Sequence, residues 1–252
     1  MMMVMNRPRG KVRDNRSNGR QTMAAGMMAW EFQLIIIEDV LGREQALAIG
    51  EALGQAPFQD GALTAGSAAR KVKQNMQARG DDAGVAALGD RVRLALDSNA
   101  RVRRMVRPVR WSNLLFSRYG TGQHYGLHAD NAAMVDEHGW PLRTDVSFTL
   151  FLSDPDTYSG GALLIPDPSG DRAFRLAAGS AVFYPTGLLH QVTPVTAGVR
   201  LACVGWIQSL VRRPDQRDIL HDLEGLRDGS DDAASLILDK TIGNLLRMWG
   251  EG

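Results

Sequence analysis

Two short motifs on strand-like segments constrain this chain more than any other feature of its sequence. His128-Ala129-Asp130 ends one such segment, and His190 follows the segment Ala181–Tyr184 after a turn that contains Pro and Gly. Successive side chains of a strand point to opposite faces, so His128 and Asp130 are expected to converge while Ala129 points away. A fold that brings His190 to the same place must return there with a further strand.

The stretch from Val109 to Leu210 is a series of short strand-like segments divided by turns rich in Gly, Pro and Asp. Many short strands at regular spacing are typical of a sandwich or a jelly roll. We therefore predict a mainly β protein with flanking helices, whose core at residues 109–211 is a double-stranded β-helix (a jelly roll). Such a core would place strand-borne side chains together at the open mouth of one barrel.

His128, Asp130 and His190 together have the composition of a metal site. Two imidazoles and one carboxylate form the facial triad that holds non-haem Fe(II) and leaves three adjacent coordination positions open. Oxygen chemistry needs this room, because a co-substrate and dioxygen bind the same metal. A lone histidine is more often a hydrogen-bonded core residue, but the three together favour an iron site in which they are the metal ligands and the catalytic residues.

Arg200 lies ten residues after His190, in the apolar, strand-like segment Val199–Leu210. On this segment it shares one face with Val204 and Trp206, while Cys203 and its alternate neighbours face the other way. A cation in a core strand is costly unless it meets an anion. A dicarboxylate such as 2-oxoglutarate would supply that anion, and the guanidinium can bind a carboxylate with two parallel hydrogen bonds. The alternative is a surface residue on an edge strand.

With these motifs the chain resembles the Fe(II)- and 2-oxoglutarate-dependent dioxygenases, and more narrowly the bacterial PKHD-type hydroxylases, named for a prolyl/lysyl-hydroxylase-like domain. The resemblance runs from about Trp30 to the C-terminus. The matching strings are Asp60-Gly61, Val72-Lys-Gln-Asn75, Phe116-Ser-Arg-Tyr119, Tyr125-Gly-Leu-His-Ala-Asp-Asn131, Arg143-Thr-Asp145, Thr149-Leu-Phe-Leu-Ser-Asp-Pro155, Tyr158-Ser-Gly-Gly-Ala-Leu163, Leu189-His-Gln-Val-Thr-Pro-Val-Thr196 and Trp206-Ile-Gln-Ser209.

The resemblance implies Fe(II) on the three ligands and the distal carboxylate of 2-oxoglutarate on Arg200. Related enzymes often hold this co-substrate with a Tyr nine residues before the first ligand, a place that Tyr119 occupies. Ser117 stands where the family commonly has Asn, and its weaker polar contact would bear on co-substrate affinity. L-ascorbate is implied as a further cofactor. The expected reaction hydroxylates a peptide-like or siderophore-like substrate and releases succinate and CO2, with a link to iron uptake.

Two other functions remain open on the sequence. A nucleic-acid demethylase of the same superfamily commonly carries a second Arg about where this chain has Trp206, and the mild acidity of the chain after its basic start disfavours a phosphate-tracking surface. A non-catalytic cupin-like metal or small-molecule sensor would share the fold but would not need Arg200. His124, His138 and His221 match no family requirement and are interpreted as ordinary polar residues.

The composition is that of an ordinary globular protein of 252 residues. One cysteine, Cys203, cannot form an internal disulfide, which suits the cytoplasm, and no apolar run has the length of a membrane span. Residues 1–26 hold six of the 29 Lys and Arg but one of the 28 acidic residues, so the rest of the chain carries −4. We predict a disordered basic tail at 1–28, which ends in methionines that are candidate true starts.

Helices are expected on both sides of the core. In the 29–108 region, a strand is predicted at Trp30–Ile37, a helix from a cap at Asp39 to Leu53, a loop at Gly54–Gly66, and a helix capped by Asp81 or Asp82. The 212–252 region is predicted to be helical, with a break at Gly229-Ser230. Its apolar stripe would cover the barrel or form a homodimer, and consists of Leu238, Ile242, Leu245 and Trp249.

Overall fold

Antiparallel sheets form the centre of the computed structural model, which describes residues 34–251 apart from 68 and 137. The larger sheet has eight strands. In spatial order they are β1 (Ile35–Ile37), β14 (Ala181–Pro185), β10 (Val146–Phe151), β17 (Arg200–Ser209), β6 (Leu115–Tyr119), β4 (Met76–Ala78) and β2 (Phe58–Asp60), with β5 (Pro108–Trp111) paired to β17. The predictions for the tail at 1–28 and for the start of the first strand lie outside the described residues.

The smaller sheet has five strands and carries both histidines of the predicted metal site. Its order is β13 (Arg172–Phe174), β12 (Leu163–Ile165), β15 (His190–Val192), β7 (His124–His128) and β3 (Lys73–Gln74). Two further pairs are β8 (Ala133–Val135) with β9 (Pro141–Arg143), and β11 (Tyr158–Gly160) with β16 (Val195–Gly198). Every pairing is antiparallel, as expected for a jelly roll, and the predicted fold class is confirmed.

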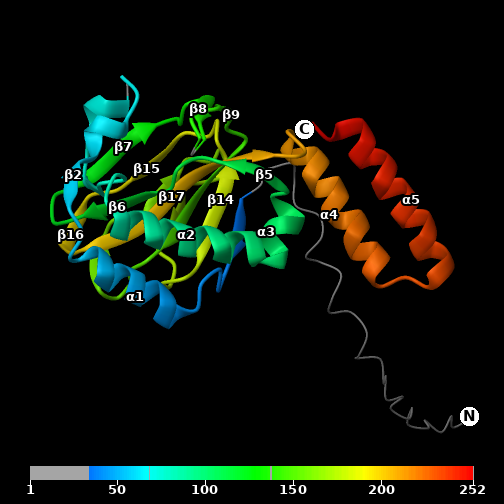
Figure 1. Cartoon of the computed structure of the whole chain (residues 1–252), viewed down its shortest axis with the longest axis horizontal. Coiled ribbons are helices and arrows are strands. Elements are labelled where there is room, and N and C mark those ends of the chain that lie inside the picture. Colours follow the sequence, from blue (N-terminus) through cyan, green and yellow to red (C-terminus); the bar gives the residue numbers. More distant parts are fainter. Residues whose placement is uncertain (1–33, 68, 137, 252) are drawn as a thin grey trace, which may run out of the picture. The chain divides into compact units, whose positions relative to one another are not determined.

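Each face of the larger sheet packs in its own hydrophobic cluster, because side chains alternate between the two faces along its strands. On one side Phe148, Phe183 and Cys203 pack against helices α1 (Arg43–Leu53), α2 (Ala83–Ser98) and α3 (Ala100–Met105), which run along that side in Figure 1. On the other side Phe151 and Tyr184 meet Leu163 and Ile165 of the smaller sheet. Fully burying one such side chain stabilises the fold by roughly 1.5–3 kcal/mol. The space between the two sheets holds the candidate site.

The helices before the core match the sequence predictions in part. Asp82 caps α2, since its side chain accepts a 3.0 Å hydrogen bond from the Val85 amide. The predicted cap at Asp39 is wrong. Asp39 has φ 54° in a tight turn, and α1 begins only at Arg43 because the buried Val40 and Leu41 hold the intervening chain against the core. The loop predicted at 54–66 contains β2 and a 3₁₀ helix at Gly61–Thr64.

The C-terminal region is a hairpin of two helices, α4 (Pro214–Asp228) and α5 (Asp232–Trp249), separated at the predicted break (Figure 1). Ile242 is 5% exposed and packs with Leu220 of α4 and with Val211, which follows β17. Of the predicted apolar stripe, Ile242, Leu245 and Trp249 thus pack in the cluster with α4 and the end of β17, whereas Leu238 is not part of this cluster. Glu224 of α4 joins the hairpin to the body through ion pairs with Arg104 and Arg107 at 3.2 and 2.8 Å. Among the described helices, none is long and apolar enough to span a membrane.

A candidate metal centre between the two sheets

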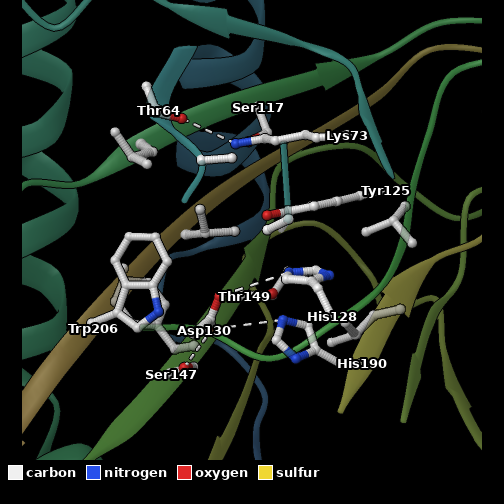
Figure 2. Close-up of a pocket in the computed structure, with 18 of the residues that line it drawn as sticks. Thr64, Lys73, Ser117, Tyr125, His128, Asp130, Ser147, Thr149, His190 and Trp206 are labelled. Carbon is white, nitrogen blue, oxygen red and sulfur yellow. Dashed lines mark hydrogen bonds and ion pairs between the residues drawn. The ribbon is translucent and has the colours of Figure 1, made fainter. Parts of the chain in front are cut away.

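A cavity open to solvent lies between the sheets and brings together the side chains predicted from the sequence. His128 and His190 line it from the smaller sheet, and Ser117, Tyr119 and Arg200 line it from the larger one. Figure 2 shows the polar residues of its wall around the two histidines and Asp130. His124, His138 and His221 do not line this cavity.

His128, Asp130 and His190 form a cluster in which one candidate ligand atom of each lies within 4.8 Å of the others. The Nε2 atoms of His128 and His190 are 3.7 and 3.6 Å from the two carboxylate oxygens of Asp130. Both histidines come from adjacent strands, since His190 of β15 pairs directly with His128 of β7. Asp130 lies two residues beyond the end of β7, so it converges on His128 from a loop rather than from the predicted strand.

Backbone carbonyls fix the orientation of both imidazoles. Nδ1 of His128 lies 2.8 Å from the carbonyl oxygen of Gly126, and Nδ1 of His190 lies 3.0 Å from that of Leu188. An imidazole that donates from Nδ1 keeps the lone pair of Nε2 for a metal. Burial, followed by the charge of His190, lowers the pKa of His128 to about 4, so this ring is neutral at pH 7, as a metal ligand must be.

The carboxylate of Asp130 is held by a hydroxyl from the central part of the larger sheet. Ser147 of β10 donates a 2.8 Å hydrogen bond to one carboxylate oxygen of Asp130, and its hydroxyl lies 3.1 Å from that of Thr186. Two imidazole nitrogens and an oriented carboxylate oxygen suit a divalent metal of the first transition series. The donor set therefore fits Fe(II), with one side of the cluster facing the cavity.

Arg200 is 1% exposed, and among the described residues its Nε and Nη2 atoms have no hydrogen-bond partner. Its guanidinium faces the rings of Tyr119 and Phe151, with centroid distances of 5.1 and 5.4 Å. Gly161 leaves room for it: this residue has φ 63°, and a Cβ there would lie 3.1 Å from Cδ of Arg200. A buried guanidinium without an anion is costly, so the arrangement calls for a negatively charged ligand.

Tyr119 pairs with Arg200 across β6 and β17, which places the phenol beside the guanidinium. Burial raises the pKa of Tyr119 although the charge of Arg200 opposes this, so the phenol stays protonated and can donate a hydrogen bond. Ser117 lies two residues earlier on the same face of β6 and is 3% exposed. Its hydroxyl accepts from Nε2 of Gln77 at 3.4 Å, so part of its hydrogen-bonding capacity is used within the wall.

Three residues of the cavity wall have features that were not assigned a role from the sequence: Lys73, Ser147 and Trp206. Lys73 lies in the string Val72-Lys-Gln-Asn75, which carried the resemblance but offered no chemistry by itself. The indole nitrogen of Trp206 is buried without a hydrogen-bond partner among the described residues. The alternation of β17 placed Trp206 on the face of Arg200, so its position in the wall follows from the pattern.

Comparison with known proteins agrees with this site. Residues 114–208 match the 2OG-Fe(II) oxygenase superfamily. HygX from Streptomyces hygroscopicus, in a crystal structure with nickel and 2-oxoglutarate bound, superposes with a TM-score of 0.52 over 72% of this chain and 85% of that chain, at 16% identity. That likeness concerns the fold alone. The fold and the match over residues 114–208 are both similar to those of the 2-oxoglutarate- and Fe(II)-dependent oxygenases.

Full-length relatives narrow the class. A PKHD-type hydroxylase of Maricaulis maris is 46% identical over 224 residues, which covers 86% of this chain and 99% of that protein. One of Rippkaea orientalis is 44% identical over 223 residues, covering 86% and 100%. The chain belongs to the PKHD-type hydroxylases, so it is a 2-oxoglutarate-dependent dioxygenase, and Fe(II) and 2-oxoglutarate are implied. This membership favours the enzyme over the non-catalytic sensor and over the demethylase.

Proposed function

We propose that His128, Asp130 and His190 bind the Fe(II) of this hydroxylase. Support comes from their mutual distances, from the carbonyls that orient both imidazoles, and from the hydroxyl of Ser147 on the carboxylate of Asp130. Bound iron supplies the oxygen chemistry, in which 2-oxoglutarate, dioxygen and a C–H bond of the substrate yield succinate, CO2 and a C–OH group. The protein supplies the positions of the reactants and the electrostatics.

The distal carboxylate of 2-oxoglutarate is assigned to Arg200, with a hydrogen bond from Tyr119 and with Ser117 nearby. The observation that carries this assignment is the buried guanidinium with unpaired nitrogens in the wall of the same cavity as the three ligands. A carboxylate neutralises this charge and satisfies two donors at once. The rings of Tyr119 and Phe151 keep water away from the contact and so strengthen it.

The substrate is peptide-like or siderophore-like, and the reaction is linked to iron uptake. The enzyme acts in the cytoplasm, where L-ascorbate keeps its iron reduced. The apolar side chains of α4 and α5 that remain exposed, such as Leu226 at 63% and Leu236 at 71%, support a homodimer formed through this hairpin. The chain is organised as a basic tail at 1–28, a flanking region at 29–108, the dioxygenase core at 109–211 and the helical region at 212–252.

The test is to incubate the purified full chain with Fe(II), 2-oxoglutarate and ascorbate in air and to measure succinate. We expect slow succinate formation without substrate, its loss in His190→Ala, and no change in Lys71→Met, a control at an exposed residue. A parallel anaerobic titration measures binding of 2-oxoglutarate to the iron-loaded protein. If the natural chain neither binds 2-oxoglutarate nor forms succinate, the site assignment is wrong.

A further inference from the structure

Lys73 is a buried cation in the cavity wall that the proposed reaction does not use. It opens β3, at the edge of the smaller sheet, and is 8% exposed. Its Nζ donates a 3.0 Å hydrogen bond to the hydroxyl of Thr64 and lies 5.1 Å from the centre of the Tyr125 ring. Lys73 and Arg200 therefore stand on different sheets, and each presents its own positive charge to the cavity.

The ammonium of Lys73 lies over the ring of Tyr125, which in turn stacks on the candidate metal ligand His128. Tyr125 stacks on His128 with ring centroids 3.6 Å apart and an angle of 17° between the planes. Figure 2 shows Lys73, Tyr125 and His128 in that order, so a single aromatic ring separates the ammonium from a metal ligand. A group held by Lys73 would keep the rest of its molecule within reach of the metal.

The hydrogen-bonding capacity of Lys73 is largely unused. An ammonium has three donors, and among the described residues only Thr64 accepts from it. No carboxylate in the described part of the chain forms an ion pair with Lys73. Burial lowers the pKa of Lys73 to about 8, while the more distant charges of Asp130 and Asp60 oppose this, so the side chain is mostly charged at pH 7. A buried charge of this kind is costly without a counterion.

When Fe(II) and 2-oxoglutarate are bound, the other charges of the site balance and leave Lys73 without a counterion. Under the proposed function, Fe(II) and Arg200 bring three positive charges, and Asp130 and the 2-oxoglutarate dianion bring three negative ones. These balance, and among the described residues that line the cavity the only remaining full charge is that of Lys73. The reaction itself adds no further anion, so the counterion must come from the substrate.

We propose that the substrate of this enzyme carries a carboxylate, and that Lys73 binds it and thereby selects the substrate. The inference rests on the proposed function and goes further by naming the chemical class. The neighbours of Lys73 are neutral hydrogen-bonding groups, namely Thr64, Gln77 and Ser117. One ammonium among neutral donors and acceptors suits a single negative charge, whereas a phosphate dianion would call for a second cation on this wall.

Benzoate and benzamide provide the test, because they differ in charge but hardly in shape. Binding of each to the anaerobic full chain, with saturating Fe(II) and 2-oxoglutarate, is measured by calorimetry. We expect saturable benzoate binding, at least about tenfold weaker benzamide binding, and an equal affinity for both in Lys73→Met. Lys71→Met is the matched control: its side chain is exposed two residues away, and it should behave like the natural chain.

Three results would overturn the proposal. Benzoate could bind Lys73→Met as well as it binds the natural chain, or it could fail to bind the natural chain at all. Alternatively, Lys73→Met could lose 2-oxoglutarate affinity as Arg200→Ala should, which would place Lys73 in the co-substrate site. Binding of 2-oxoglutarate to the natural chain is measured first, so a failure of the proposed function is seen separately from a failure of the carboxylate subsite.

Discussion

The hydroxyl of Ser147, on strand β10 of the larger sheet, donates a 2.8 Å hydrogen bond to the carboxylate of Asp130. One carboxylate oxygen is thereby held in place, and the other remains free to approach a metal. Ser147→Ala should weaken Fe(II) binding by roughly 10–100-fold, the usual effect of removing a group that orients a ligand. Anaerobic metal titration measures this, with Co(II) as a second probe. Ser98→Ala, at an exposed residue, is the control, and equal affinities in both variants would contradict the role of Ser147.

Arg200 should determine co-substrate affinity and leave metal affinity nearly unchanged. Losing a charge-assisted contact costs roughly 1.5–3 kcal/mol, so Arg200→Ala should raise the Kd of 2-oxoglutarate at least about tenfold. Arg200→Lys should recover only part of this loss, because an ammonium cannot form the paired contacts of a guanidinium. Tyr119→Phe should have a smaller effect in the same direction. Anaerobic titration of the iron-loaded variants decides, and an unchanged Kd in Arg200→Ala would refute the assignment.

The metal-free protein should lose stability as the pH falls from about 6.5 to about 5. The pKa of His128 is lowered to about 4 in the folded chain, whereas an unfolded histidine has a pKa of about 6.5. Between these values the unfolded chain binds the extra proton, so the free energy of unfolding decreases as the pH falls. The full shift corresponds to at most about 3 kcal/mol.

Urea unfolding of the metal-free chain at several pH values tests this dependence. Between about pH 6.5 and about pH 5, His128→Gln should lose clearly less free energy of unfolding than the natural chain. His124→Gln, which alters a histidine outside the cavity, should match the natural chain. If the free energy of unfolding changed equally with pH in all three proteins, His128 would not be the titrating group.

The hairpin of α4 and α5 should depend on its buried contacts. Ile242 is 5% exposed, so Ile242→Ala should lower the free energy of unfolding by about 2–5 kcal/mol. Met248 on the same helix is 73% exposed, and Met248→Ala should be nearly neutral. Thermal unfolding measures both variants, and sedimentation shows whether either changes the oligomeric state. Equal melting temperatures would mean that the packing of Ile242 contributes little.

The sequence predicted the metal cluster because His128, Asp130 and His190 are the residue types of an iron site, and it predicted the fold class from the regular spacing of short strands and turns. The separation of His128 and Asp130 brings them together whether or not the strand continues, and the alternation along β17 assigns Arg200 to the cavity. The cap at Asp39 was predicted wrongly because two buried residues after it override a local preference. Lys73 and Ser147 could not be assigned roles, since each reaches the site through long-range pairing, of β3 with β7 and of β10 with β17.

The ten residues of β17 carry Arg200 and Trp206 toward the cavity and Cys203 and Ile207 toward the helices. Inserting or deleting one residue between Arg200 and Ile207 would exchange these faces for the rest of the strand. Arg200 and the core residues that follow it would then no longer lie on opposite faces of the strand. Length variation among natural versions of this enzyme should therefore be excluded from this strand and concentrated in turns such as the one around Gly187, where an added Cβ would meet nothing within 4 Å.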